Sequence, residues 1–209
     1  MNAPERLHPA HTALLFFDML NGHIKKDDPA TQARYAPVIP NAVRLLEAAR
    51  QRDMMVVYAA AHHRADNATS ASLLTDTDNR LRPHTPGAPR EFKPVVTGGT
   101  WEAQVIDELK PQPQDYLIPK FRWSAFYQTY LDLALRNRNV DTLVVSGGST
   151  DVGVASTAYA ARDLDYNLVI VSDACTSPEQ DNHAQFMRRI FPRMARVRTA
   201  EQVVQMLIT

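Results

Sequence analysis

Three apolar stretches of the sequence are each followed by polar groups that could do chemistry. Asp18 follows ALLFF, Lys120 follows YLIP, and the glycine-rich segment GGSTDVGVAST, residues 147–157, follows LVVS. A carboxylate can take up or release a proton, and the N–H groups of a glycine-rich turn can stabilise an oxyanion. Alone, each has an ordinary structural alternative, with the Asp as a helix cap and the Lys as a solvated surface group. Together they indicate acid–base chemistry on a small molecule.

The apolar stretches predict the strands that position these groups. Residues 12–17, 54–60, 115–118, 142–146, 168–172 and 195–198 are rich in Val, Ile, Leu and Phe, as in strands buried on both faces. Helical spacing of apolar residues predicts helices over 39–50 and 124–137. Capping boxes at Ser177 with Gln180 and at Thr199 with Gln202 predict two more helix starts.

Strands alternating with helices predict an α/β fold. We expect a single-domain, doubly wound, Rossmann-like sheet of about six mostly parallel strands flanked by helices, spanning residues 1–209. In an open parallel sheet, ligands bind beyond the carboxyl ends of the strands. Asp18, Lys120 and the glycine-rich segment should therefore meet in one crevice.

Composition restricts the partners. Lys plus Arg and Asp plus Glu both number 23, so the zero net charge gives no attraction toward nucleic acid or anionic lipid. The one cysteine, Cys175, fits a reducing compartment, and the sequence shows neither a signal-peptide layout nor a membrane-length apolar run. We expect a cytoplasmic protein with a small-molecule substrate and with neither a nucleic-acid nor a membrane partner.

Residues 61–100 contain a proline-rich stretch without clear periodicity. Such a long connection is either a functional wall of the active site or a flexible surface loop. His62 and His63 at its start and Arg90 within it are candidate substrate-binding residues, with ordinary surface positions as the alternative.

The motifs around these residues resemble those of the isochorismatase-like hydrolases, also called the cysteine hydrolase superfamily. ALLFFDMLN around Asp18 resembles the first motif of the group, with Leu20 where Gln is usual, and PKFRWSAF around Lys120 resembles the second. LVVSGGSTDVGVASTAYAARDLDYNLVIVSDACTS resembles the third and the strand that follows it. The likeness covers nearly the whole chain in the same order.

The resemblance implies a catalytic set of Asp18, Lys120 and a residue at the start of the last motif's helix. In most of the group that residue is a nucleophilic cysteine, and in this sequence it is Gly153. The resemblance also implies a non-proline cis peptide between Gly148 and Ser149, with the amides of Ser149 and Gly153 forming an oxyanion site. Cys175 lies after the next strand and is expected to be a core residue.

Three functions remain open. In the first, a protonated Asp18 cleaves an enol (vinyl) ether or similar acid-labile bond without covalent catalysis, and Lys120 binds a substrate carboxylate or hydroxyl. In the second, the chain is an amidohydrolase of a ureide, carbamoyl or nicotinamide-like amide whose cysteine is replaced at Gly153, naturally or by design. In the third, it is a catalytically idle binding homologue.

Further contacts complete the expected site. Arg122, Phe126 and Asp151 join the candidate substrate-binding residues, although packing explains Phe126 as well and helix capping explains Asp151 as well. Trp123 is expected to pack against the fold. Adjacent histidines point to opposite sides of a strand, so we expect no metal, and GG at 147–148 lacks a dinucleotide fingerprint, so we expect no cofactor. The resemblance implies a homo-oligomer, a dimer or a tetramer.

Overall fold

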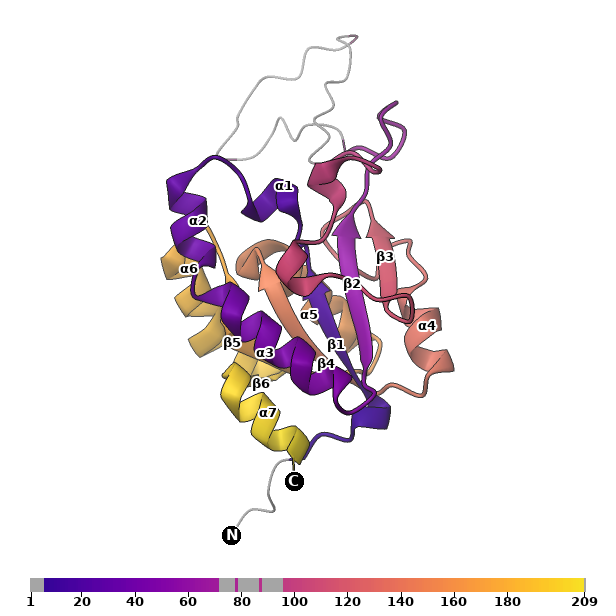
Figure 1. Cartoon of the computed structure of the whole chain (residues 1–209), viewed down its shortest axis with the longest axis vertical. Coiled ribbons are helices and arrows are strands. Elements are labelled where there is room, and N and C mark those ends of the chain that lie inside the picture. Colours follow the sequence, from indigo (N-terminus) through magenta and orange to yellow (C-terminus); the bar gives the residue numbers. More distant parts are fainter. Residues whose placement is uncertain (1–5, 72–77, 79–86, 88–95, 209) are drawn as a thin grey trace.

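The structure is a computed structural model that describes residues 6–71, 78, 87 and 96–208 (Figure 1). The position of Arg90 and most of the loop predicted over residues 61–100 lie outside the described residues. Within the described part, no helix is both long and apolar enough to cross a bilayer.

A six-stranded sheet with the order β3-β2-β1-β4-β5-β6 forms the centre of the molecule, and every neighbouring pair is parallel. The strands are β1 (Thr12–Phe17), β2 (Met55–Ala61), β3 (Tyr116–Lys120), β4 (Thr142–Gly148), β5 (Asn167–Thr176) and β6 (Arg196–Arg198). The predicted doubly wound α/β fold is confirmed. Strand order reverses between β1 and β4, and in such sheets a ligand-binding crevice opens at this switch point.

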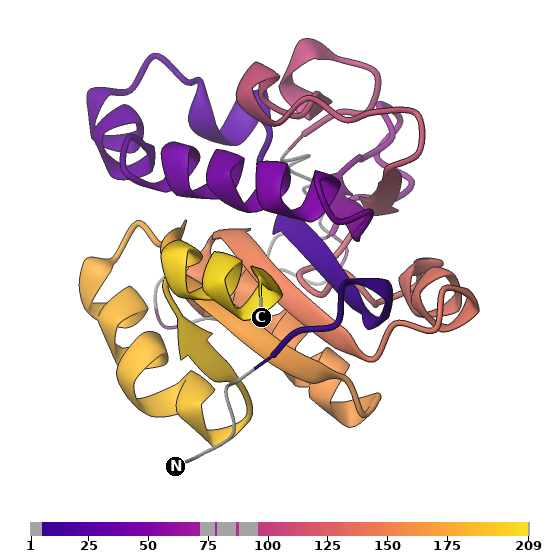
Figure 2. The same cartoon turned by 60° about the horizontal axis from the view of Figure 1, so that its bottom comes forward.

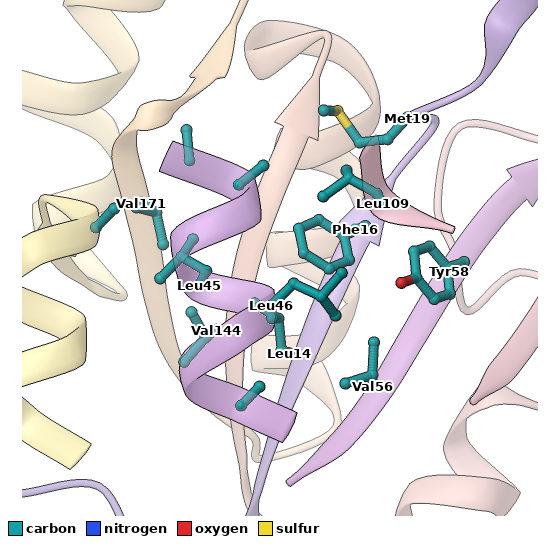
Figure 3. Packing of buried hydrophobic residues seen from close by; sticks show 14 of the residues in the cluster. Leu14, Phe16, Met19, Leu45, Leu46, Val56, Tyr58, Leu109, Val144 and Val171 are labelled. Carbon is teal, nitrogen blue, oxygen red and sulfur yellow. The ribbon is translucent and has the colours of Figure 1, made fainter. Parts of the chain in front are cut away.

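Helices cover both faces of the sheet, which is why β1, β2 and β4 are buried along their whole length (Figures 1 and 2). On one face, α3 (Val38–Arg50) packs on alternate side chains of β1 such as Leu14 and Phe16, and α7 (Ala200–Ile208) packs on α3 and β5. Figure 3 shows Leu45 and Leu46 of α3 against this surface. On the other face, α4 (Leu131–Asn137) and α5 (Ala155–Asp163) contribute to the same buried cluster as Leu15 and Phe17.

Shorter helices complete the chain. They are α1 (Asn21–Ile24), α2 (Pro29–Tyr35) and α6 (Gln180–Gln185), the 3₁₀ turns Pro9–His11, Trp101–Ala103, Asp107–Leu109 and Phe191–Arg193, and the π-helical turns Thr150–Val154 and Phe186–Ile190. Helix α2 was not predicted. Its signal was nevertheless present, since Asp28 accepts a hydrogen bond from Ala30 N at its start and Pro29 occupies its first position.

Two helix predictions need correction and one is confirmed. The helix predicted over 124–137 begins only at Leu131, because Gln128 has a φ of 55°, which a right-handed helix does not accommodate. Ser177 does not cap α6, since its hydroxyl donates to Asp151 instead. Thr199 and Gln202 do form a capping box, with their side chains and backbone N–H groups bonded reciprocally.

Candidate active site

An ion pair joins the ends of β1 and β3. Asp18 Oδ2 lies 2.7 Å from Lys120 Nζ, and both side chains are largely buried. Asp18 Oδ1 accepts a hydrogen bond of 2.8 Å from the N–H of Ala61, at the end of β2 between the two strands. The two residues that the sequence places after separate strands are therefore in direct contact, and Lys120 is paired with Asp18.

The ring of Phe17 forms the other neighbour of this ammonium group. Lys120 Nζ lies 4.3 Å from the centroid of the ring, within cation–π range. The ring itself is almost fully buried. Lys120 thus sits between a carboxylate and an aromatic face.

A cavity of about 400 Å³ opens beside the ion pair, between the ends of the strands and α2. Predicted site residues that line it are Asp18, His63, Lys120, Arg122, Gly148, Ser149 and Gly153. The cavity therefore brings together residues from after β1, β2, β3 and β4, as expected for a parallel sheet.

The glycine-rich segment forms a tight turn at the end of β4. Gly147 has a φ of 129°, and a side chain there would overlap the backbone carbonyl of Phe17, so this position requires glycine. The peptide bond between Gly148 and Ser149 is cis. The chain then continues through the π-helical turn into α5, which leaves Gly153 buried at the cavity wall.

Gly153 is packed directly against Phe17. A Cβ atom at position 153 would overlap the edge of the Phe17 ring, which occupies the space where a larger residue would carry its side chain. Under the motif correspondence, this is the space of the nucleophilic thiol. The missing side chain and the bulky neighbour are sterically complementary.

Cys175 lies elsewhere. It is buried on β5, its Sγ is 3.7 Å from the carbonyl oxygen of Val145, and it does not line the cavity. Burial raises the pKa of this thiol to about 12. It is the one cysteine of the sequence, so no thiol faces the cavity.

Asp151 does not line the cavity and does not cap a helix by itself. Its carboxylate accepts hydrogen bonds from the hydroxyls of Ser149 and Ser177 and from Asn182 Nδ2. Burial raises the pKa of this carboxyl, but the three hydrogen bonds outweigh it and the pKa is lowered. Asp151 therefore stabilises the turn that contains Ser149 through these hydrogen bonds.

Two other predicted contacts lie away from the cavity. His62 is exposed and its ring packs over Gly98, while Phe126 packs against the ring of Tyr166 at 5.7 Å between centroids. Trp123, expected to pack against the fold, is instead 62% exposed and lines the cavity rim.

Sequence reasoning missed one wall of the cavity, formed by α1, α2 and the chain between them. Its side chains are His23, Lys26, Thr31, Arg34 and Tyr35. The Asp28–Pro29 helix start could have indicated α2, but nothing in the local pattern shows which of its residues face the strand ends.

His23 is the missed residue nearest the ion pair. Its Nε2 lies 4.0 Å from Asp18 Oδ2, too far for a hydrogen bond, and it has no hydrogen-bond partner within the described part of the chain. Burial lowers the pKa of His23. The negative charge of Asp18 acts to raise this pKa, and the positive charges of Lys120 and Lys26 lower it further. The imidazole is therefore neutral at neutral pH.

Comparison with known proteins agrees with this architecture. The family model for the isochorismatase domain matches residues 12–202. The uncharacterized isochorismatase family protein YwoC of Bacillus subtilis (strain 168) is 31% identical over 196 residues, 93% of each chain. Ureidoacrylate amidohydrolase RutB of Pseudomonas savastanoi pv. phaseolicola is 32% identical over 186 residues, 82% of this chain and 73% of that protein.

A solved structure extends the likeness to three dimensions. An isochorismatase family protein from Burkholderia thailandensis has a TM-score of 0.79 and 30% identity, over 99% of this chain and 100% of that one. The resemblance inferred from the motifs is confirmed.

Burial of Cys175 predicts that the native protein resists thiol alkylation. With a pKa of about 12 and a side chain out of solvent, the thiol of the folded protein should not react with iodoacetamide at about pH 7.5. In about 6 M guanidinium chloride, which unfolds the protein, the thiol should react fully. Intact mass measures both reactions. Rapid alkylation of the folded protein would contradict the position assigned to Cys175.

Proposed function

The chain belongs to the isochorismatase family, and from that premise we propose that it is a hydrolase that cleaves a small molecule without a thiol nucleophile. The observation that carries this proposal is the Phe17 ring beside Gly153. The ring occupies the space that a thiol at position 153 would take, and the one cysteine is buried away from the cavity. A covalent thioester route therefore has no residue to form it.

Water is then the nucleophile, and Asp18 is the group that moves its proton. The carboxylate is contacted by the ammonium of Lys120 and the N–H of Ala61, both of which interact favourably with its charged form. A carboxylate in this setting is suited to accept a proton from water. In the proposed reaction, the water oxygen bonds to the carbonyl carbon, the C–N bond breaks, and the proton taken by Asp18 passes to the leaving nitrogen.

In this reaction, the turn after β4 stabilises the oxyanion. Ser149 and Gly153 line the cavity within the same turn, and their backbone N–H groups are the proposed donors. Lys120 adds a positive charge beside the reacting atoms. Neither role requires a side chain at position 153.

We favour a C–N bond of a small ureide or amide as the target. Two features support it: relatives named ureidoacrylate amidohydrolase match most of the chain, and Asp18 is arranged as a proton acceptor. Enol ether cleavage is the second candidate, favoured by the missing thiol, because that reaction needs only a proton donor. It requires Asp18 to carry a proton before the reaction begins, whereas Lys120 and the N–H of Ala61 both donate to the oxygens of its carboxylate.

Substitution of Asp18 tests the proposal. We expect wild-type protein to hydrolyse at least one member of a panel of ureides, amides and carboxyvinyl ethers, and Asp18→Asn to lower kcat/KM by about 100-fold or more, the loss expected for a general acid–base group. Asp163→Asn, an exposed change on α5, is the matched control and should leave the rate unchanged.

Turnover that survives Asp18→Asn would refute the role of the carboxylate. Binding of panel members with no turnover by any variant would instead identify an idle binding protein. The bond that is cleaved separates the two candidate reactions.

A second test makes residue 153 larger and residue 17 smaller and measures the stability of each variant. Gly153→Cys alone should destabilise the fold by about 1–3 kcal/mol, because the new side chain meets the Phe17 ring. Phe17→Val makes room, so the double variant Phe17→Val/Gly153→Cys should be more stable than the two single changes added together. Urea unfolding of all four proteins measures this coupling. Strict additivity would mean that Phe17 does not fill the space of the thiol.

A further inference from the structure

The cavity carries more positive than negative charge. Lys26, Arg34, Lys120 and Arg122 line it, and among the described lining residues Asp18 is the one with a carboxylate. Asp18 is already paired with Lys120 at 2.7 Å. The other three cations form no ion pair with any described residue, so among the described lining residues positive charge exceeds negative charge.

Arg34 is the least exposed of the three. Helix α2 holds it half-buried, and its Nη2 donates to Thr31 Oγ1 at 2.9 Å. Thr31 in turn donates to Asp28 Oδ2 at 2.6 Å, so the contact from Arg34 to the nearest acid runs through a hydroxyl rather than an ion pair. Arg34 Nε is shielded from solvent and has no hydrogen-bond acceptor in the described part of the chain.

A shielded N–H group without an acceptor is costly, and a ligand carboxylate that accepts from Arg34 Nε would relieve that cost. Thr31 holds one edge of the group in place, which lowers the entropy lost when a ligand binds. The planar guanidinium matches a carboxylate, which can accept two N–H groups at once. Lys26 and Arg122 are exposed, and Arg122 Nη1 already donates to the carbonyl oxygens of Thr69 and Phe121, so both add mainly long-range attraction.

Tyr35 connects this charge to the candidate catalytic turn. Arg34 Cζ lies 5.7 Å from the Tyr35 ring centroid, and the Tyr35 hydroxyl packs against Gly148 so closely that a side chain at 148 would overlap it. Burial raises the pKa of Tyr35 to about 12, so the hydroxyl stays a neutral donor. Arg34 and the turn with Ser149 therefore flank Tyr35 within one cavity.

We propose that Arg34, with Tyr35 beside it, forms a carboxylate-binding subsite, and that the substrate is an anionic ureide or amide with a carboxylate away from the bond that is cleaved. This inference rests on the proposed function for the identity of that bond but not for the subsite itself. It also reassigns substrate carboxylate binding, which the sequence suggested for Lys120, because Lys120 is paired with Asp18.

Calorimetric binding of a matched probe pair tests the subsite. The probes are 3-ureidopropionate and its neutral amide, 3-ureidopropionamide, which differ in charge but hardly in size. Wild-type protein should bind the carboxylate about tenfold or more tightly than the amide, the difference that corresponds to about 1.4 kcal/mol. Arg34→Gln should reduce that preference to about threefold or less by weakening carboxylate binding alone.

Arg44→Gln on α3 is the matched control, since it removes the same charge from an exposed helix position away from the cavity. It should keep the wild-type preference, and thermal unfolding checks that both variants are folded. Three outcomes would overturn the inference. Arg34→Gln could keep the full wild-type preference, or Arg44→Gln could lose the preference to the same extent. The wild-type protein could also show no preference or bind neither probe.

Turnover separates this inference from the proposed function. If the protein prefers the carboxylate probe through Arg34 but hydrolyses no panel member, the proposed function is contradicted and the subsite is not. Hydrolysis of ureides whose KM is insensitive to both the charge of the substrate and Arg34→Gln contradicts the subsite alone.

Discussion

Asp18 and Lys120 hold opposite charges 2.7 Å apart in a largely buried position, and the rest of the candidate site is arranged around that pair. Each charge alone would carry a desolvation cost of several kcal/mol, on the order expected for buried ions, so each depends on the other. The pair can form only where parallel strands end together. Because β2 lies between β1 and β3 and contributes the Ala61 N–H, three strand ends must be in register before the carboxylate is positioned.

The packing of the large Phe17 side chain against Gly153 follows from the same geometry. Phe17 precedes Asp18 on β1, and the turn after adjacent β4 brings Gly153 against its ring. A small residue facing a large one preserves close packing, which protein interiors require. Phe17 also covers Lys120. One aromatic ring thus accounts for the glycine and shields the ion pair.

Much of this could be predicted from the sequence, and the limits have physical causes. Buried parallel strands are long apolar runs, so the sheet was predictable, and strand ends converge, so Asp18, Lys120 and Gly153 could be grouped. The role of Phe17 was hidden because its contact with Gly153 is non-local. Arg34 and Tyr35 were missed because α2 reaches the cavity through tertiary packing. Asp151 was misassigned because its bonding partners, Ser177 and Asn182, lie far along the chain.

The most direct test of hydrolysis without a thiol is the kcat/KM of a cysteine-free protein, Cys175→Ala, measured beside wild type on the best ureide or amide substrate. Because Cys175 is buried away from the cavity, we predict values that agree within about twofold, the variation expected when no transition-state contact is lost. A folded Cys175→Ala protein that has lost hydrolysis would contradict the account.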